Sequence, residues 1–250
     1  MKQRILGIEF SDLPLEELVD QALKGGLTVV PSGPGLAVDL RHNEEYQKAL
    51  ATADTVIADS GAMALFWRLF RGRRIRRISG LRFLSSLLQQ SALHDPGATF
   101  WVHPSECQQL KNRKWLLDQG LPLADEDNYV APMYPEYRLS DKKLWDQLSQ
   151  RNPKAIILCI GGGVQERLGW WIREQYRVNK RNCPAIICTG AAIGFLSGNQ
   201  VHIPAWADRM YLGWLIRCLS EPRRYLPRYW SAVPLAYRIF RYKAEHPNSW

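Results

Sequence analysis

Short apolar runs alternate with longer amphipathic stretches along most of the chain. The apolar runs are bounded by Gly, Pro or Asp, and we expect a β-strand in each: RILGIEF (4–10), LTVVPSG (27–33), DTVIAD (54–59), ATFWVH (98–103), NYVAPM (128–133), AIILCIGGG (155–163) and AIICTGAA (185–192). The stretches between them favour helices at 14–23, 43–52, 61–71, 80–92, 105–119, 140–150 and 165–177. Such alternation is typical of repeated βαβ units. It predicts an α/β fold, a Rossmann-like and mostly parallel sheet flanked by helices, over residues 1–200.

Ligands of an open parallel sheet bind beyond the carboxyl ends of its strands. Four of the expected strands end in segments rich in Gly, Pro or polar residues, namely 31–35, 59–61, 103–105 and 161–165. We therefore expect these four segments to meet at one crevice.

The composition changes at about residue 201. Residues 201–250 hold eight Arg or Lys against three acids, together with four tryptophans, and show no strand-like alternation. Trp206, Met210, Trp214 and Cys218 recur every four residues, which indicates one face of a helix. We expect a helical, membrane-associating appendage over 201–250. Its tryptophans could instead close one edge of the sheet or bind a partner helix, so three roles stay open.

The charge and the cysteines narrow the class of protein. A formal net charge of +9 and a pI near 9.4 favour an acidic partner such as nucleic acid, anionic lipid or a phosphorylated substrate. The five cysteines form no CxxC pair, which favours a reducing compartment without structural zinc. The chain shows neither a secretory signal pattern nor an apolar run of the length, about 18 residues, that a spanning helix needs. We expect a cytoplasmic protein that can still lie on a membrane.

Asp59 ends the run TVIAD and precedes Ser60, Gly61 and an expected helix. An aspartate at this place can cap the helix by accepting hydrogen bonds from first-turn N–H groups, and Ser60 could do the same. It can also act as a general base at the crevice, taking a proton from an attacking hydroxyl. The local pattern leaves both roles open.

Two further stretches suit anions. Six arginines lie between residues 68 and 77, where they could form a solvated face or bind phosphate, including that of nucleic acid. No recognition motif for nucleic acid accompanies them, so we expect no nucleic acid as partner. The glycine-rich turn in CIGGGVQERLGWWI suits an anion at a helix N-terminus, or serves only the close packing of turn and helix.

A metal-dependent reaction has little support in the sequence. The acidic loop Asp125, Glu126 and Asp127 has a spacing that metal-dependent sugar transferases use, but such loops are common on solvated surfaces. The histidines His94, His103 and His202 lack metal-ligand spacing. We expect no metal site and no cofactor.

Four segments together resemble the WecG/TagA/CpsF family of bacterial glycosyltransferases, glycosyltransferase family 26, over about residues 5–240. They are ADTVIADSGAMALFWRLFRGRRIRRISGLRFL (53–84), GGGVQERLGWWI (161–172), CTGAAIGFLSG (188–198) and IPAWADRMYLGWLIRCLSEPRRYLPRY (203–229). The last is the most specific, because the signature residues are in register: Pro204, Trp206, Trp214, Arg217, Glu221, Pro222 and Arg224.

The resemblance implies an inverting transfer of a hexose or N-acetylhexosamine from a UDP-sugar to a polyprenyl-diphosphate-linked saccharide, as in bacterial cell-surface polysaccharide synthesis. The reaction would take place without an essential metal, by a peripheral protein on the anionic inner face of the plasma membrane. Asp59 would be the base, and the substrate-binding residues would be Ser32, Gly33, Gly61, Arg77, Gly80, Tyr129, Gly161, Gln165, Arg217, Arg223, Arg224 and Arg228. Whether the chain forms a homo-oligomer is left open.

Several positions depart from the family's pattern. The family's turn Thr-x-Asn has Pro31 and Gly33 in place of its Thr and Asn. The family's proline before Gln165 is Gly163 in this chain. Four further motif positions are occupied by Arg82, His103-Pro104, Gly194 and Gly213. The departures predict a different donor and acceptor pair, or a catalytically degenerate member that binds a UDP-sugar or lipid diphosphate as a scaffold.

Overall fold

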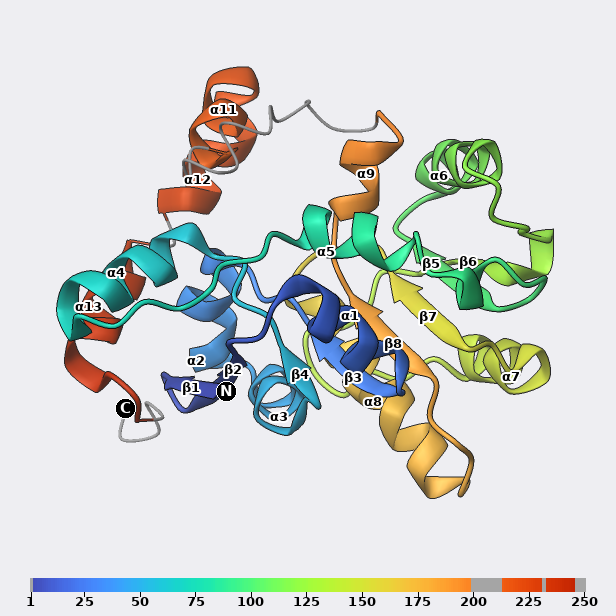
Figure 1. The fold of residues 1–250 in the computed structure, drawn as a ribbon, viewed down its shortest axis with the longest axis horizontal. Coiled ribbons are helices and arrows are strands. Elements are labelled where there is room, and N and C mark those ends of the chain that lie inside the picture. Colours follow the sequence, from blue (N-terminus) through green and yellow to red (C-terminus); the bar gives the residue numbers. More distant parts are fainter. Residues whose placement is uncertain (1, 199–212, 231–232, 246–250) are drawn as a thin grey trace.

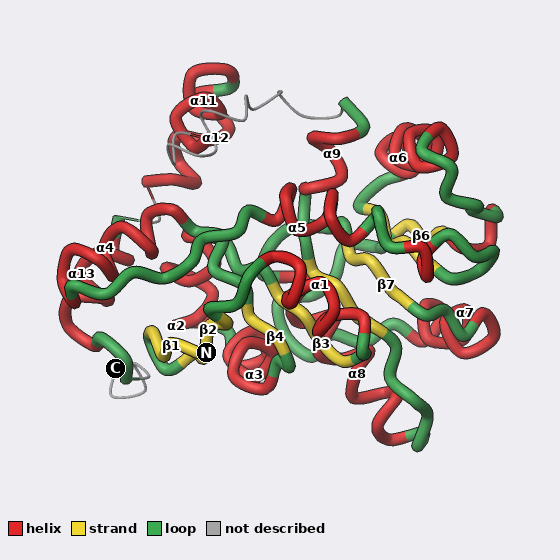
Figure 2. Tube along the Cα trace, in the orientation of Figure 1, coloured by secondary structure: helices red, strands yellow, loops and turns green. Residues whose placement is uncertain are grey.

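The computed structural model describes residues 2–198, 213–230 and 233–245. Its centre is a six-stranded sheet in the order β4-β3-β8-β7-β5-β6, and every neighbouring pair of strands is parallel. The strands are β3 (Gly26–Val29), β4 (Thr55–Val56), β5 (Thr99–His103), β6 (Asn128–Val130), β7 (Ala155–Leu158) and β8 (Ala185–Cys188). Figures 1 and 2 show the strands in the middle of the molecule with helices around them. The α/β, Rossmann-like prediction is confirmed.

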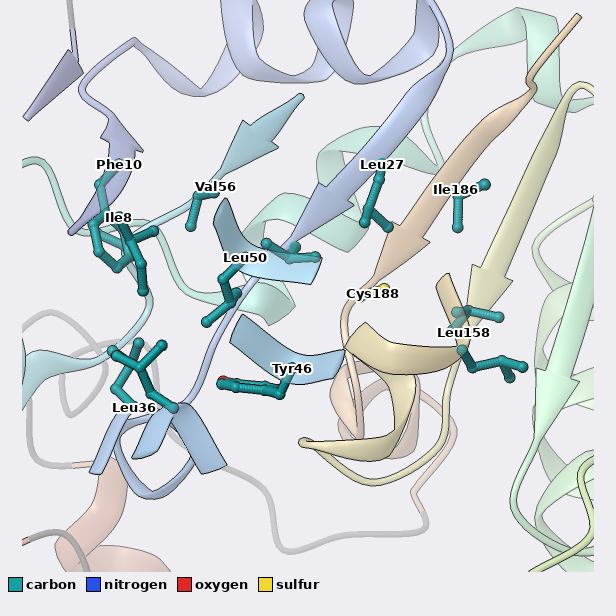
Figure 3. Close-up of a cluster of buried hydrophobic side chains, with 14 of the residues drawn as sticks. Ile8, Phe10, Leu27, Leu36, Tyr46, Leu50, Val56, Leu158, Ile186 and Cys188 are labelled. Carbon is teal, nitrogen blue, oxygen red and sulfur yellow. The ribbon is translucent and has the colours of Figure 1, made fainter. Parts of the chain in front are cut away.

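Helices cover both faces of this sheet, so its strands bury side chains on both sides. On one face pack α3 (Glu44–Thr52), α7 (Lys142–Arg151) and α8 (Val164–Val178); on the other pack α1 (Leu15–Leu23), α5 (Gly80–Leu87), α6 (Glu106–Asp118) and α9 (Ala192–Leu196). In β8, for example, Ile186 and Cys188 join the first cluster of buried side chains and Ile187 joins the second. Figure 3 shows part of the first cluster, with Leu27, Leu158 and Ile186 from three neighbouring strands.

Side-chain caps explain why the helices begin close to where the sequence predicts. Asn43, Ser60, Ser79 and Ser105 each accept a hydrogen bond from a first-turn N–H, at the start of α3, α4 (Gly61–Arg71), α5 and α6. Short helical turns occupy three connections: η1 (Gly35–Asp39) with α2 (Leu40–His42), η2 (Ser91–Leu93) and η3 (Asp125–Asp127). The helix expected at 80–92 is shorter, because α5 ends at Leu87.

The first apolar run is not a strand of the parallel sheet. It folds into an antiparallel hairpin of β1 (Lys2–Ile5) and β2 (Ile8–Ser11). Leu6 and Gly7 form the turn between them with φ of 50° and 78°. Gly7 adopts this conformation without a steric penalty, which is why the run can reverse here. The expectation of a single strand at this place was wrong.

The expected appendage divides into two parts. Helix α13 (Pro234–Tyr242) packs against α4, its Leu235 and Ile239 are fully buried, and the chain after it hydrogen-bonds to the turn of the N-terminal hairpin. Helices α11 (Gly213–Ser220) and α12 (Pro222–Trp230) pack on each other, and Figure 1 shows them projecting from the rest of the molecule. Trp206 and Met210 lie outside the described residues. None of the described helices has the length and apolar character to cross a bilayer.

Candidate functional site

A cleft of about 330 Å³ lies beyond the carboxyl ends of β3 and β7. Its lining comes from the loop and turn after β3 and from the glycine-rich turn after β7: Ser32, Pro34, Gly35, Val38, Asp39, Gly161 and Gly162. Two of the four segments expected at one crevice therefore line this cleft. A parallel sheet offers a ligand site at this edge, because its connections open there.

Asp59 lies between β4 and the start of α4 and is not among the residues that line this cleft. The cap of α4 is Ser60, whose Oγ accepts from the Met63 N–H at 3.2 Å. Asp59 therefore keeps its carboxylate for other contacts: Oδ1 accepts from the Gly80 N–H at 3.3 Å and lies 4.0 Å from the Arg77 guanidinium. The side chain is about one third exposed, at 32%. A partly exposed carboxylate at a strand end is placed to accept a proton from a ligand.

The chain after α4 brings Arg77 and Gly80 back to this strand end. The Arg77 Nε donates to the Asp59 carbonyl oxygen at 2.7 Å, and the Ile78 N–H donates to the Ala58 carbonyl at 3.0 Å. The other arginines of the run are exposed, at positions 68, 71, 73, 74 and 76. Arg77 alone of the six is thus held next to Asp59, through its own hydrogen bond to the backbone.

Gly33 connects this strand end to the cleft. A Cβ atom on Gly33 would lie 3.0 Å from the Ser60 Oγ, so the loop after β3 passes directly over the start of α4. Gly61 is the first residue of that helix. The structure therefore brings together six of the sequence-predicted site residues, which are Ser32, Gly33, Asp59, Gly61, Arg77 and Gly80.

Gln165 ties the glycine-rich turn to the end of β8. Its Oε1 accepts from the Gly190 N–H at 2.6 Å, and its Nε2 donates to Glu166 Oε1 at 3.0 Å. Glu166 Oε2 in turn accepts from the Gly163 N–H at 2.7 Å. Gln165 is buried at 2% exposure, so it holds the turn from beneath. Gly161 lines the cleft itself, and a Cβ there would meet no atom within 4 Å.

Glu166 and Asp39 are features of the site that the sequence did not single out. Glu166 is 1% exposed, and burial raises its pKa to about 7. Asp39 comes from η1 and lines the cleft opposite the glycine-rich turn. The pair Gln-Glu after three glycines was a local signal for Glu166, whereas a single acid between an expected strand and an expected helix gives no signal for Asp39.

Tyr129 does not reach the cleft. Its strand β6 is the edge strand at the opposite end of the sheet from β4. Its hydroxyl donates to Asp141 Oδ2 at 2.8 Å, and the Tyr134 hydroxyl donates to the same oxygen at 2.7 Å. Burial and the neighbouring carboxylate raise the pKa of Tyr129. These contacts position the segment that follows β6 rather than a ligand.

His103, in the segment 103–105, and the acidic loop 125–127 are held by hydrogen bonds and ion pairs to other side chains of the protein. His103 is fully buried, its ring nitrogens contact Asn128 at 3.0 Å and Asn112 at 3.3 Å, and burial lowers its pKa to about 4. Asp127 is also buried and accepts from Arg151 Nε at 2.9 Å, while Asp125 pairs with Arg113. The acidic loop is thus anchored by arginines, and His103 is turned into the protein.

The arginines of the C-terminal signature lie on α11 and α12. Arg223 is exposed on α12. The side chains of Arg217, Arg224 and Arg228 lie outside the described part of the chain. Their place relative to the cleft therefore stays a prediction.

Comparison with known proteins identifies the family. The model of the glycosyl transferase WecG/TagA/CpsF family matches residues 3–249. One curated relative is the N-acetylglucosaminyldiphosphoundecaprenol N-acetyl-beta-D-mannosaminyltransferase of Bacillus spizizenii, 23% identical over 221 residues that cover 83% of this chain and 79% of the relative. The chain belongs to the WecG/TagA/CpsF family of glycosyltransferases.

Proposed function

We propose that this protein transfers a hexose or N-acetylhexosamine from a UDP-sugar to a polyprenyl-diphosphate-linked saccharide, with inversion at the anomeric carbon, in the synthesis of a bacterial cell-surface polysaccharide. The observation that carries the proposal is the place of Asp59. It lies between β4 and α4, next to Ser60, over which the loop that leads to the cleft passes; it leaves the capping of α4 to Ser60, and it lies 4.0 Å from the Arg77 guanidinium. The name of the curated relative, which includes a lipid-diphosphate acceptor, supports the class of acceptor.

The residues around Asp59 suit a single displacement. Asp59 takes the proton of the acceptor hydroxyl, the hydroxyl oxygen attacks the anomeric carbon from the face opposite UDP, and the bond from that carbon to the UDP oxygen breaks. UDP leaves with the bonding electron pair and gains negative charge. In this proposal the Arg77 guanidinium supplies the positive charge that stabilises the departing diphosphate, while the Gly80 N–H holds the Asp59 carboxylate. We therefore propose that the transfer needs no metal ion.

The contact with the membrane, in this proposal, is made by α4 together with α13. Leu65 and Leu69 on α4 and Tyr237 and Phe240 on α13 are each more than half exposed. The two helices are joined by an edge-to-face contact of Phe70 with Phe240, whose ring centroids are 5.4 Å apart.

Exposed arginines accompany these apolar side chains, at 68 and 71 on α4 and at 73, 74 and 76 after it. An exposed apolar surface with cations suits the headgroup region of an anionic bilayer. Because α4 begins next to Asp59, a bilayer at this surface would present the lipid-linked acceptor close to the base. This favours a peripheral protein on the cytoplasmic face of the plasma membrane.

The transfer is tested by release of UDP. The wild type, Asp59→Asn and the control Asp118→Asn, which changes an exposed carboxylate on α6, are incubated with a panel of UDP-sugars and a synthetic lipid-diphosphate saccharide, without and with added divalent metal. We expect release by the wild type and the control without metal. Asp59→Asn should lose it by about 100-fold or more while still binding the donor. UDP release by Asp59→Asn at the wild-type rate would refute the assignment of Asp59 as the general base.

A binding protein without turnover is the second candidate, favoured by Pro31, Gly33 and Gly163 at motif positions. Wild type that binds a UDP-sugar or the lipid diphosphate but releases no UDP with any donor would support it.

The membrane contact has its own test. The double variant Leu65→Glu/Leu69→Glu should lose binding to vesicles rich in phosphatidylglycerol. The control Leu110→Glu changes a leucine on α6 that is as exposed as Leu69, 69% in each case, and should bind as the wild type does. Equal vesicle binding by the double variant and the control would show that α4 does not contact the bilayer.

A further inference from the structure

A basic loop, residues 72–79, connects α4 to α5 (Figure 2). It belongs to a stretch, residues 60–94, that contains seven arginines and no Asp or Glu. Three of these arginines, Arg73, Arg74 and Arg76, are exposed on the loop. Like charges repel one another, and a run of them without acids creates a positive potential that attracts an anion.

The backbone of the basic loop is held in one path. Gln3 Nε2 donates to the Arg74 carbonyl oxygen at 2.6 Å, and the Arg76 N–H donates to Asp12 Oδ1 at 2.9 Å. Ile75, between these two arginines, is buried at 6% exposure. The exposed guanidinium groups are therefore carried by a fixed segment, which lowers the entropy lost when a ligand orders them.

The protein does not neutralise the charges of the basic loop. Among the described residues, no carboxylate forms an ion pair with Arg73, Arg74 or Arg76. Asp12, a carboxylate that contacts the loop, accepts from the Arg76 backbone N–H and from a neighbouring side-chain amide. The three guanidinium groups thus keep their donors for a ligand, and their planar fork matches the oxygens of a phosphate.

The basic loop ends next to the proposed base. The Ile78 N–H donates to the Ala58 carbonyl at 3.0 Å, and Arg77 Nε donates to the Asp59 carbonyl at 2.7 Å. Arg73 precedes Arg77 by four residues, so their Cα atoms lie within about 14 Å of each other. A saccharide acceptor whose hydroxyl lies at Asp59 carries its diphosphate at the other end of the sugar. A diphosphate on the basic loop is therefore within reach of the base.

The other end of the basic loop adjoins the apolar surface proposed for the membrane. Helix α4 ends at Arg71, directly before the loop, and its Leu65 and Leu69 are 61% and 69% exposed. A polyprenyl diphosphate combines an apolar chain with two phosphates, so the leucines suit its chain and the arginines suit its headgroup. A phospholipid such as phosphatidylglycerol offers only one phosphate to the three neighbouring guanidinium groups.

We propose that the basic loop binds the diphosphate of the lipid-linked acceptor, and that Arg73, Arg74 and Arg76 contact it. The inference rests on the proposed function for its acceptor and adds a binding site to that function. The loop selects the diphosphate-bearing lipid from the other anionic lipids of the bilayer and holds its saccharide towards Asp59. Arg77 stays with the departing UDP, so the two diphosphates bind to different arginines.

Binding to vesicles tests this site without any transfer. The vesicles consist of phosphatidylcholine alone, of phosphatidylcholine with phosphatidylglycerol, or of phosphatidylcholine with polyprenyl diphosphate at the same total charge. The wild type should bind the diphosphate vesicles about tenfold or more tightly than the phosphatidylglycerol vesicles. The triple variant Arg73→Gln/Arg74→Gln/Arg76→Gln should lose that preference.

A matched control removes the same charge elsewhere. Lys111, Lys114 and Lys142 are exposed on α6 and α7, and Lys111→Gln/Lys114→Gln/Lys142→Gln should keep the preference of the wild type. The single variants Arg73→Gln and Arg76→Gln repeat the test should the triple variant fold poorly, and each should lower the preference severalfold.

Transfer kinetics give a second measurement. The triple variant should raise the KM for the acceptor by about tenfold and leave the KM for the UDP-sugar little changed. A wild type that transfers no sugar, but shows a diphosphate preference that the triple variant loses, would overturn the proposed function and leave the binding site standing.

Four results would overturn the binding site. They are equal binding of the wild type to both charged vesicles, a preference that survives in the triple variant or in both single variants, a preference that the control loses as well, and a loss of affinity for the UDP-sugar in place of the acceptor. The first would assign the arginines to the anionic bilayer in general, and the last would assign them to the donor. All four are compatible with UDP release by the wild type, so the proposed function would stand.

Discussion

Glu166 should make the folded protein less stable as the pH rises from about 4.5 to 7. Burial raises its pKa from 4.5 to about 7, against the opposing hydrogen bonds from Gln165 and Gly163. Between these two values the unfolded chain releases a proton that the folded chain keeps. The unfolded state therefore binds fewer protons, and the free energy of unfolding falls as the pH rises. Below pH 4.5 both states are protonated, and above 7 both are ionised.

The size of the effect follows from the two pKa values. A pKa change of one corresponds to about 1.4 kcal/mol, so the change from 4.5 to about 7 corresponds to about 3 kcal/mol. His103 works in the opposite direction, because burial lowers its pKa from 6.5 to about 4. Its unfolded form binds more protons over this range, so its contribution to stability rises with pH by a similar amount. The two effects should nearly cancel in the wild type between pH 4.5 and 6.5.

Urea unfolding at pH 4.5, 5.5, 6.5 and 7.5 separates the two groups. We expect the free energy of unfolding of the wild type to change little with pH. That of Glu166→Gln should increase by about 3 kcal/mol from the lowest to the highest pH, because the effect of His103 is then unopposed. His103→Asn should show the reverse slope. The variant Asp118→Asn, which changes an exposed carboxylate, controls for the general effect of charge. A constant difference in stability between wild type and Glu166→Gln at all four pH values would refute the assignment of the slope to Glu166.

Three further changes have defined outcomes. Ser60→Ala should lower the free energy of unfolding by about 1 kcal/mol through loss of the α4 cap, whereas Asp59→Asn should change it little; urea curves showing the reverse would make Asp59 the cap. Tyr46→Phe should stabilise the protein by about 1 kcal/mol, since it removes a buried hydroxyl that has no hydrogen-bond partner among the described residues; a loss of stability in the same assay would show that the hydroxyl is satisfied. Ile239→Ala should cost about 2 to 5 kcal/mol, and a thermal-melting change near zero would place α13 outside the core.

The sequence predicted most helices well because their signals are local. The helix expected at 61–71 is α4 with the same limits, since Ser60 caps one end and Gly72 adopts a left-handed φ of 64° at the other. The hairpin at the N-terminus was missed for the opposite reason. Its turn at Leu6 and Gly7 is fixed also by hydrogen bonds to Lys243 and Ala244, which are distant in sequence. Such contacts leave no trace in a hydrophobic pattern.

The residues of the candidate site also differ in whether the sequence could reveal them. Asp59 could be found because it follows a recognisable strand and precedes a recognisable helix, although only the structure shows that Ser60 is the cap. Asp39 could not be found, because it lies between an expected strand and an expected helix and belongs to no motif. Its role comes from the approach of η1 to the turn before α8, which makes it a neighbour of Gly163. Gly163 has a φ of 89°, which proline cannot adopt, and a Cβ atom there would lie 2.8 Å from Asp39 Oδ2, so the structure accounts for glycine at this position.

The charges around the cleft also bear on the sides from which substrates would meet the site. Asp59 and Arg77 lie next to the start of α4, the helix that the proposed membrane contact involves, whereas Asp39 lines the cleft. On the proposed function, a lipid-linked acceptor approaches Asp59 along α4, which begins two residues after it, whereas the UDP-sugar enters through the cleft. Because the two substrates then come from different sides, the affinity for the UDP-sugar should not depend on lipid; calorimetric titration with and without vesicles would contradict this if the affinity changed.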